Sequence, residues 1–168
     1  MATHVIDLTD ALVPDPSNTA APYWQPASIL DTNDLHDGVQ YLIFPDGSTK
    51  IGAMCRFTVP QNFVGTAVWK VRWKSAATSG DVVWDVDYNA IAVGESGDPS
   101  SVTENDTATD TVPGTTELLA DIDVTPTSGN FAVGDTVLVT LSRDSTDAAD
   151  TMADEAELVG FQFSYADA

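Results

Sequence analysis

Basic residues, histidine and cysteine are scarce in this sequence. Six Lys and Arg residues stand against 26 Asp and Glu, which gives a formal net charge of -20 over 168 residues. A protein that binds a phosphate backbone needs a basic surface, so direct binding to nucleic acid is not expected. The single cysteine, Cys55, cannot form a disulfide within the chain. No apolar run approaches the ~18 residues of a membrane-spanning helix, and the N-terminus lacks the pattern of a signal peptide.

Catalytic motifs are also lacking. Both histidines, His4 and His36, lie in or beside an N-terminal stretch without a regular pattern. Ser-His-Asp and Cys-His chemistry needs a base that is held firmly beside the nucleophile. We find no phosphate-binding loop, nucleophile elbow or Cys/His zinc pattern, and paired carboxylates carry no information in a chain with 26 acids. The sequence therefore predicts a protein that is not an enzyme and needs no cofactor.

The acidic residues are mostly aspartate, and they indicate a surface suited to concentrated salt. Of the 26 acids, 21 are Asp, whereas Lys occurs only at Lys50, Lys70 and Lys74. At ~1 M salt the Debye length is ~3 Å, so that separated carboxylates hardly repel one another. Short, well-hydrated Asp with little Lys is the composition expected of a halophilic protein. The alternative is an ordinary acidic surface that keeps a secreted or virion protein in solution.

Proline sets the first 37 residues apart from the rest. Four prolines punctuate this stretch, at Pro14, Pro16, Pro22 and Pro26. Because proline lacks an N–H and stiffens the chain, we predict an extended N-terminal arm over residues 1–37 and a β-sandwich domain over residues 38–168. Such an arm is either disordered or lies along a neighbouring surface. Three apolar side chains favour the second alternative, because they can anchor contacts with a partner: Tyr23, Trp24 and Ile29.

Residues 38–168 show the two-residue periodicity of β-strands, with frequent turn sequences between the strands. Seven strands are predicted, at Val39–Phe44, Ile51–Val59, Thr66–Ser75, Asp81–Val93, Thr115–Thr125, Thr136–Ser142 and Glu155–Tyr165. No long stretch has helical spacing. This pattern predicts an all-β fold, an antiparallel β-sandwich of jelly-roll type. The long polar stretch from Glu95 to Thr116 is predicted to be a loop at one end of the sandwich.

Two consecutive predicted strands have complementary faces. In Thr66–Ser75, three apolar residues alternate with three basic ones, Lys70, Arg72 and Lys74. A hairpin with the next strand would place Trp73 opposite Trp84, Arg72 opposite Asp85 and Lys70 opposite Asp87. The basic residues then either fix the strand register or, if a carboxylate comes from another chain, form an interface. The tryptophans are expected to pack in the core rather than to form a sugar-binding platform.

An Asp-rich segment between the last two predicted strands is a candidate metal site. It contains Asp144, Asp147, Asp150 and Asp154. Ca²⁺ takes six to eight oxygen ligands, which such a segment can supply. The spacing and the central glycine of an EF-hand are missing. The alternative to a Ca²⁺ site is a solvated acidic loop.

Several stretches of the sequence resemble a family of viral proteins. The run Phe57-Thr-Val-Pro-Gln-Asn-Phe63 leads into the tryptophan-rich strands, and Gly134-Asp135, Arg143-Asp144 and a closing strand to Tyr165 follow later. Over residues 39–165 the chain resembles the small β-sandwich structural proteins of tailed viruses, which are head decoration (cement) proteins or fibre-type modules. The resemblance implies a non-enzymatic virion part that is usually trimeric. The acidic composition is similar to that of proteins of haloarchaea and their tailed viruses.

The function expected from this resemblance is that of a virion structural protein. We expect a capsid decoration protein that stabilises the head of a tailed virus from the outer surface of the capsid. Its partners would be the major capsid protein and copies of itself in a homotrimer, contacted through the anchors of the arm and through Lys70, Arg72 and Lys74. The alternative is a tail or fibre module that mediates attachment to the host surface. A further rival is an acidic carbohydrate-active enzyme.

Overall fold

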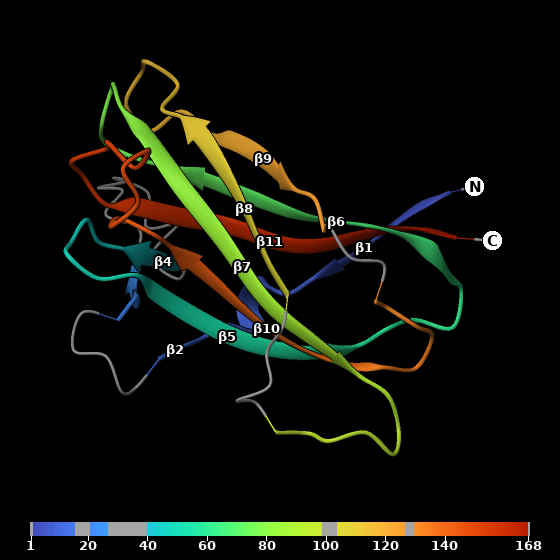
Figure 1. The fold of residues 1–168 in the computed structure, drawn as a ribbon. Coiled ribbons are helices and arrows are strands. Elements are labelled where there is room, and N and C mark those ends of the chain that lie inside the picture. The colour runs from blue at the N-terminus through green and yellow to red at the C-terminus, as the bar shows by residue number, and fades with distance from the viewer. Residues whose placement is uncertain (1, 16–20, 27–39, 99–103, 127–129, 168) are drawn as a thin grey trace.

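Two antiparallel β-sheets face each other in the computed structural model, which describes residues 2–15, 21–26, 40–98, 104–126 and 130–167 (Figure 1). The six-stranded sheet contains β1 (Thr3–Asp7), β3 (Tyr23–Pro26), β4 (Gln40–Phe44), β6 (Phe63–Lys74), β9 (Ala120–Val124) and β11 (Ala156–Asp167). The five-stranded sheet contains β2 (Val13–Pro14), β5 (Ile51–Thr58), β7 (Asp81–Ile91), β8 (Glu104–Thr111) and β10 (Thr136–Arg143). A single 3₁₀ turn, η1 (Thr9–Ala11), is the one helical element in the described ranges.

The strand order shows why the sequence alternates as it does. The order is β3-β4-β11-β6-β9 in the first sheet, with β1 also beside β11, and β2-β5-β10-β7-β8 in the second. Each sheet turns one face to a shared core, so apolar residues recur at every second position. The predicted antiparallel β-sandwich of jelly-roll type is confirmed. In the described parts of the chain, no helix is long and apolar enough to cross a membrane.

All seven predicted strands are present, and the largest shift is in the fifth, which begins at Ala120 rather than at Thr115. The prediction of a loop from Glu95 to Thr116 is wrong, because β8 lies within it and pairs with β7. β8 is an edge strand with polar residues on both faces, so that it lacks the alternation that marks the other strands. Its inward residue Asp110 accepts a hydrogen bond from Nε1 of Trp73 at 2.9 Å. Inward acidic residues on an edge strand also discourage pairing with another sheet.

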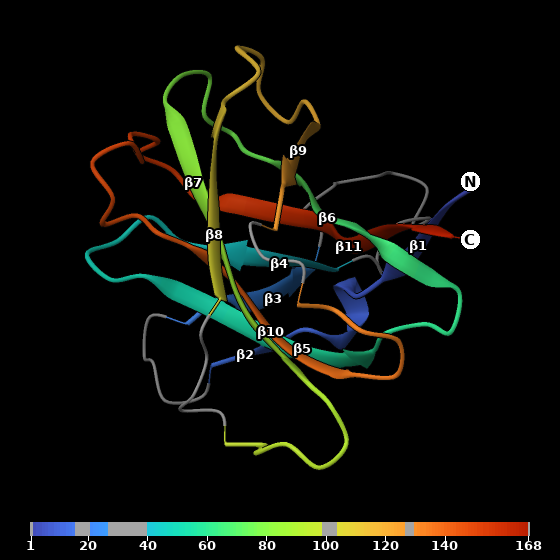
Figure 2. The same cartoon turned by 45° about the vertical axis from the view of Figure 1, so that its right-hand side comes forward.

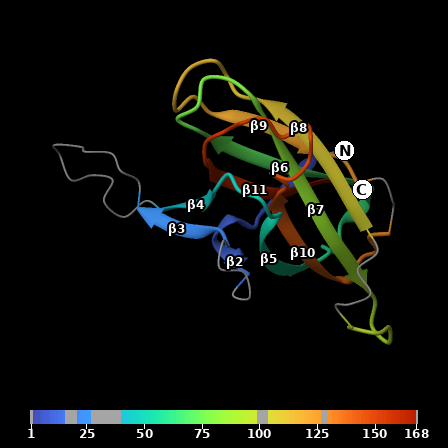
Figure 3. The same cartoon turned by 60° about the vertical axis from the view of Figure 1, so that its left-hand side comes forward.

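The described parts of the N-terminal stretch lie along the sheets of this same chain. β1 pairs with β11, β2 with β5 and β3 with β4, and Figure 3 shows β3 beside β4 at the edge of its sheet. Leu8 and Leu12 are buried in the core. At these positions, the surface along which the N-terminal stretch lies belongs to the same chain and not to a partner. The predicted boundary between residues 37 and 38 lies outside the described residues, as does Ile29.

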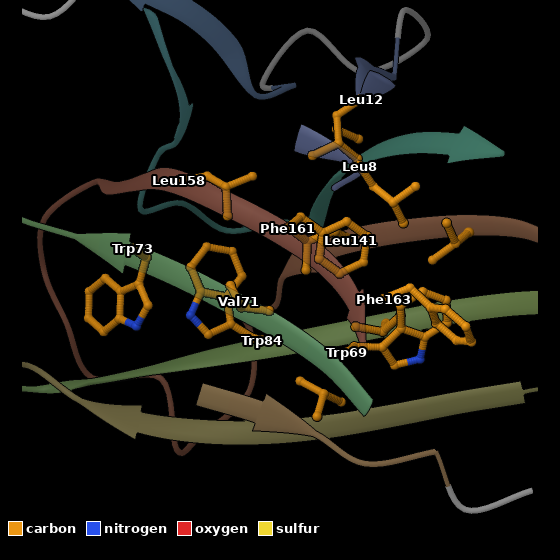
Figure 4. Close-up of a cluster of buried hydrophobic side chains, with 14 of the residues drawn as sticks. Leu8, Leu12, Trp69, Val71, Trp73, Trp84, Leu141, Leu158, Phe161 and Phe163 are labelled. Atoms are coloured by element: carbon orange, nitrogen blue, oxygen red, sulfur yellow. The ribbon is translucent and has the colours of Figure 1, made fainter. Parts of the chain in front are cut away.

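Aromatic side chains from both sheets fill the core (Figure 4). Trp69 and Trp73 on β6 and Trp84 on β7 have no solvent-exposed surface, which confirms their predicted place in the core. Trp73 and Trp84 meet edge to face across the sandwich, with ring centroids 6.2 Å apart. Trp69 stacks on Phe161 of β11 at 5.6 Å. The Trp73–Trp84 contact joins the two sheets, as does that of Trp69 with Tyr88 of β7, whose ring centroids are 5.5 Å apart.

The prediction that β6 and β7 form a hairpin is wrong. β6 and β7 belong to different sheets, and Ser75 to Gly80 carry the chain from one sheet to the other. The register pairs Arg72 with Asp121 and Lys70 with Asp123, both on β9. Both strands turn an apolar face to one core, so their patterns match whether they pair side by side or face each other. Alternation alone does not distinguish these two arrangements.

Removal of the Arg72 side chain should cost little stability. Its Nη2 lies 3.6 Å from Oδ2 of Asp121, and the two side chains are 48% and 47% exposed. Exposed ion pairs contribute up to ~1 kcal/mol, so Arg72→Ala should lower the free energy of unfolding by less than ~1 kcal/mol in urea denaturation. A loss above ~2 kcal/mol would show that this pair is not the solvated contact described here.

Candidate functional site

The four candidate metal ligands are not brought together in the structure. Oδ1 of Asp144 accepts hydrogen bonds from the backbone N and the hydroxyl of Thr146 at 3.1 and 2.6 Å, and Oδ1 of Asp147 accepts one from Ala149 N at 2.8 Å. Such contacts are the local turns that Asp favours. Within the described ranges no three His, Cys, Asp or Glu side chains are grouped to hold a metal ion. A calcium site in this segment stays a prediction.

Asp150, the third of these residues, is held by a buried arginine. Its carboxylate accepts hydrogen bonds from Nε and Nη2 of Arg143 at 3.0 and 2.8 Å. The side chain of Asp150 is 1% exposed and that of Arg143 is 0% exposed. Oδ2 of Asp150 also accepts a hydrogen bond from Val83 N at 3.0 Å. The backbone carbonyl of the fourth residue, Asp154, accepts a hydrogen bond from Nη1 of Arg143 at 2.6 Å. This part of the Asp-rich segment is therefore a structural clasp.

The candidate interface residues have partners within the chain. The Tyr23 hydroxyl lies 3.3 Å from Oε2 of Glu155, and Trp24 packs partly buried against the core. The Lys70 ammonium lies 2.6 Å from Asp123. Lys74 contacts Glu117 and Glu157 and sits over the ring of Tyr41, 4.6 Å from its centroid. On this face the basic residues stabilise strand pairing, and their part in an interface stays a prediction.

Lys74 and Cys55 show how the fold sets the charge of single groups. Burial lowers the pKa of Lys74, but hydrogen bonds to Glu117 and Glu157 outweigh it and leave the pKa raised. Lys74 is therefore charged at neutral pH. Burial raises the pKa of the Cys55 thiol to about 12. Since the thiolate is the nucleophile, Cys55 is unreactive at neutral pH.

His4 joins the two ends of the chain. Its Nε2 lies 2.8 Å from Oδ2 of Asp167, and its ring stacks on Tyr165 with centroids 5.4 Å apart. Ala2 N donates to Oδ1 of Asp167 at 2.6 Å. The hydrogen bond from His4 lowers the pKa of Asp167, so this carboxylate stays charged at neutral pH. Figure 1 shows the termini side by side, and these contacts assign His4 a structural role.

A polar hollow lies where β7 ends and β8 begins, at the opposite end of β7 from the Arg143 clasp. Figure 2 shows β7 and β8 beside each other in the five-stranded sheet. Its volume is about 360 Å³. Eight residues line it: Asn89, Ala90, Ala92, Glu95, Glu104, Asn130, Ala132 and Asp135. They come from both strands and from the segments that follow β7 and precede β10. The volume falls within the range of small-ligand pockets, near its lower limit.

Backbone and amide groups hold the carboxylates of this hollow in place. Ala92 N donates to Oε2 of Glu95 at 3.0 Å, and Ala132 N donates to Oδ2 of Asp135 at 2.9 Å. Nδ2 of Asn130 donates to Oε1 of Glu104. A carboxylate has about four acceptor positions, so each of these groups can accept further hydrogen bonds from a ligand. The hollow thus presents fixed acceptors.

Exposed valines flank the hollow. Val93 is fully exposed and follows Ala92, and Val133, which follows Ala132, is 44% exposed. Such exposed apolar side chains beside a polar recess are available for contact with a bound ligand. Sequence reasoning missed this site because its residues lie in three separate segments of the chain and are of common types. The nearest signal is the long polar stretch from Glu95 to Thr116, which the sequence predicts only as a loop at one end of the sandwich.

Comparisons with known proteins show a likeness of fold. No protein-family model matches the chain, and no curated protein matches its sequence. A CBM35 from Cellvibrio japonicus Abf62 has a TM-score of 0.49 at 13% identity, covering 99% of this chain and 95% of that chain. The C-terminal CBM6 of LamC, a laminarinase from Zobellia galactanivorans, has a TM-score of 0.46 at 11% identity, covering 98% and 100%. A family 11 carbohydrate-binding module from Clostridium thermocellum has a TM-score of 0.47 at 7% identity, covering 96% and 86%. At such identities the likeness concerns the β-sandwich alone.

Proposed function

We propose that this chain is a non-catalytic attachment module that holds a neutral sugar residue of a surface glycan in the hollow at the end of β7. The observation that supports the proposal is the hollow itself, a recess of about 360 Å³ with fixed carboxylates, two amides and three alanine methyl groups. Sugar hydroxyls donate hydrogen bonds to carboxylates and accept them from amides. The alanine methyl groups offer contacts to the C–H face of a sugar ring. The lining can therefore hydrogen-bond to the hydroxyls of a sugar and also contact the C–H face of its ring.

The charge of the lining narrows the ligand class. Glu95, Glu104 and Asp135 are acidic, and none of the eight described lining residues is basic. A sulfated or uronic sugar would bring a like charge into the recess and would be repelled. A neutral sugar meets no such cost. Its hydrogen bonds also persist in concentrated salt, where long-range charge attraction is screened.

Attachment is better supported than capsid decoration. The decoration hypothesis uses an N-terminal arm that reaches along neighbouring subunits. The described strands of that stretch, β1 to β3, pair with β11, β5 and β4 of the same chain. Their backbone hydrogen bonds are thus satisfied internally. The setting in a virion of a halophilic host rests on the resemblance of the sequence, and decoration stays a prediction.

Binding to a glycan array tests the proposal. The array should hold neutral, amino and acidic glycans, with the protein in ~2 M NaCl to screen its charge. We expect retention on neutral glycans and none on sulfated ones. Glu104→Gln and Asn130→Ala should each weaken binding ~5-fold or more, because a polar group of the sugar left without its hydrogen bond costs about 1–3 kcal/mol.

Asp121→Asn is the matched control, since it also removes one charge but lies on the other sheet. It should bind like the unaltered protein. If no neutral glycan is retained, or if the two variants in the hollow bind as well as this control, the proposed function is wrong.

A further inference from the structure

One basic side chain of this chain differs from the other five. Lys50, Lys70, Arg72, Lys74 and Arg143 each lie within 4 Å of a carboxylate in the described structure. Arg56 is also described, and it has no ion pair among the described residues although the chain carries 26 acids. Its guanidinium is exposed on β5. A cation that forms no ion pair with the described acidic residues of so acidic a molecule is available for a contact between molecules.

The surroundings of Arg56 are partly apolar. Arg56 faces outward from the five-stranded sheet, beside Leu138 of β10, and Asn89 of β7 follows in the same row. Met54 lies one row away and is 44% exposed, and its neighbour Val13 is 58% exposed. Arginine and methionine are enriched at protein interfaces, where exposed aliphatic groups become buried.

The charges at the centre of this face balance. We define the central face as the outward residues Thr136, Leu138, Thr140 and Ser142 of β10 with their neighbours on β5 and β7, and with Lys50, which reaches over them. Its two acids are Asp85 and Asp87, and Nζ of Lys50 contacts them at 2.6 and 2.9 Å. With Arg56 there are two cations and two anions. Another copy of a chain with net charge -20 can therefore approach here without meeting a like-charged surface.

We infer that the central face is the interface with a second copy of this chain, related by a two-fold axis that runs parallel to β10. Such an axis brings β5 of one copy over β7 of the other, because these strands flank β10 on opposite sides. Arg56 then lies over Asn89 and Asp87 of the second copy, and Leu138 meets its own counterpart on the axis. The surface is self-complementary, as an isologous contact requires. The face shares Asn89 with the lining of the hollow, but its charged residues lie outside that lining, and the inference does not depend on the proposed function.

Sedimentation velocity over a range of protein concentrations in ~2 M NaCl tests this interface. The unaltered protein should dimerise. Arg56→Glu replaces attraction by repulsion and should raise the dimer dissociation constant ~10-fold or more, and Leu138→Asp, which sets two carboxylates together at the axis, should raise it further. Both changes are at the surface, and an unchanged melting temperature would show that each variant folds.

Arg72→Glu is the matched control, because it makes the same charge reversal on the six-stranded sheet. It should leave the dissociation constant unchanged. A protein that stays monomeric up to ~1 mM contradicts the inference. So does a dimer that tolerates both variants of the central face, or one that Arg72→Glu weakens instead.

Discussion

Arg143→Met should lower the free energy of unfolding by about 3–5 kcal/mol, the cost of breaking a buried ion pair by removing one partner. All five N–H groups of this guanidinium have acceptors. Two go to Asp150, one to the Met152 carbonyl at 2.5 Å, one to the Asp154 carbonyl at 2.6 Å and one to the Phe44 carbonyl at 3.4 Å. The variant would leave a buried carboxylate and three carbonyls without these donors. Urea denaturation measures the loss.

Two further variants distinguish the loss of the Arg143–Asp150 ion pair from a general loss of packing as the cause of the lower stability. Arg143→Met combined with Asp150→Leu removes both charges, and it should recover part of the lost stability because no buried charge remains unpaired. Arg72→Met is the exposed control and should cost less than ~1 kcal/mol. If Arg143→Met costs no more than this control, the clasp does not hold the segment after β10 as described.

Trp84→Ala should cost about 3–5 kcal/mol, which is the usual loss for a large aromatic residue in a core. Trp84 has no exposed surface, and it meets Phe44 with ring centroids 5.2 Å apart and Trp73 at 6.2 Å. Through these contacts Trp84 packs against the other sheet, so its removal would leave a cavity between the two sheets. Calorimetry or urea denaturation measures the effect.

Trp84→Phe provides the control for shape. It keeps most of the apolar volume and removes Nε1, which has no hydrogen-bond partner in the described structure. The cost should therefore be well below that of Trp84→Ala. A loss under ~1 kcal/mol for the alanine variant would mean that Trp84 does not lie in the core that joins the sheets.

The core of this fold could be predicted from the sequence, but the pairing of its strands could not. Alternation in β6 and β7 identified Trp69, Trp73 and Trp84 as core residues because every strand shows one face to the interior. The same pattern suits a hairpin and two facing strands, so Arg72 was matched with Asp85 instead of Asp121. β8 escaped detection because Asp106 and Asp110 occupy positions that are apolar in the other strands.

The two polar centres were hidden from the sequence for different physical reasons. Arg143 lies beside Asp144 at the end of a strand, where a charged pair usually indicates solvent, and its burial depends on carbonyls that only the fold brings together. The hollow is assembled from separate segments, and Asn89, Glu104 and Asn130 have no distinctive spacing in the sequence. Only the tertiary structure brings these residues together in one site.

An NMR titration can detect, residue by residue, whether the hollow at the end of β7 binds a neutral sugar. Neutral trisaccharides of glucose, mannose and galactose would be added to the ¹⁵N-labelled protein in ~2 M NaCl. We expect at least one of them to shift the side-chain amide signals of Asn89 and Asn130 and the backbone signals of Ala92 and Ala132, while signals of β6 and β9 stay in place. Spectra that do not change with any of the three, or that change only outside the hollow, would contradict this expectation.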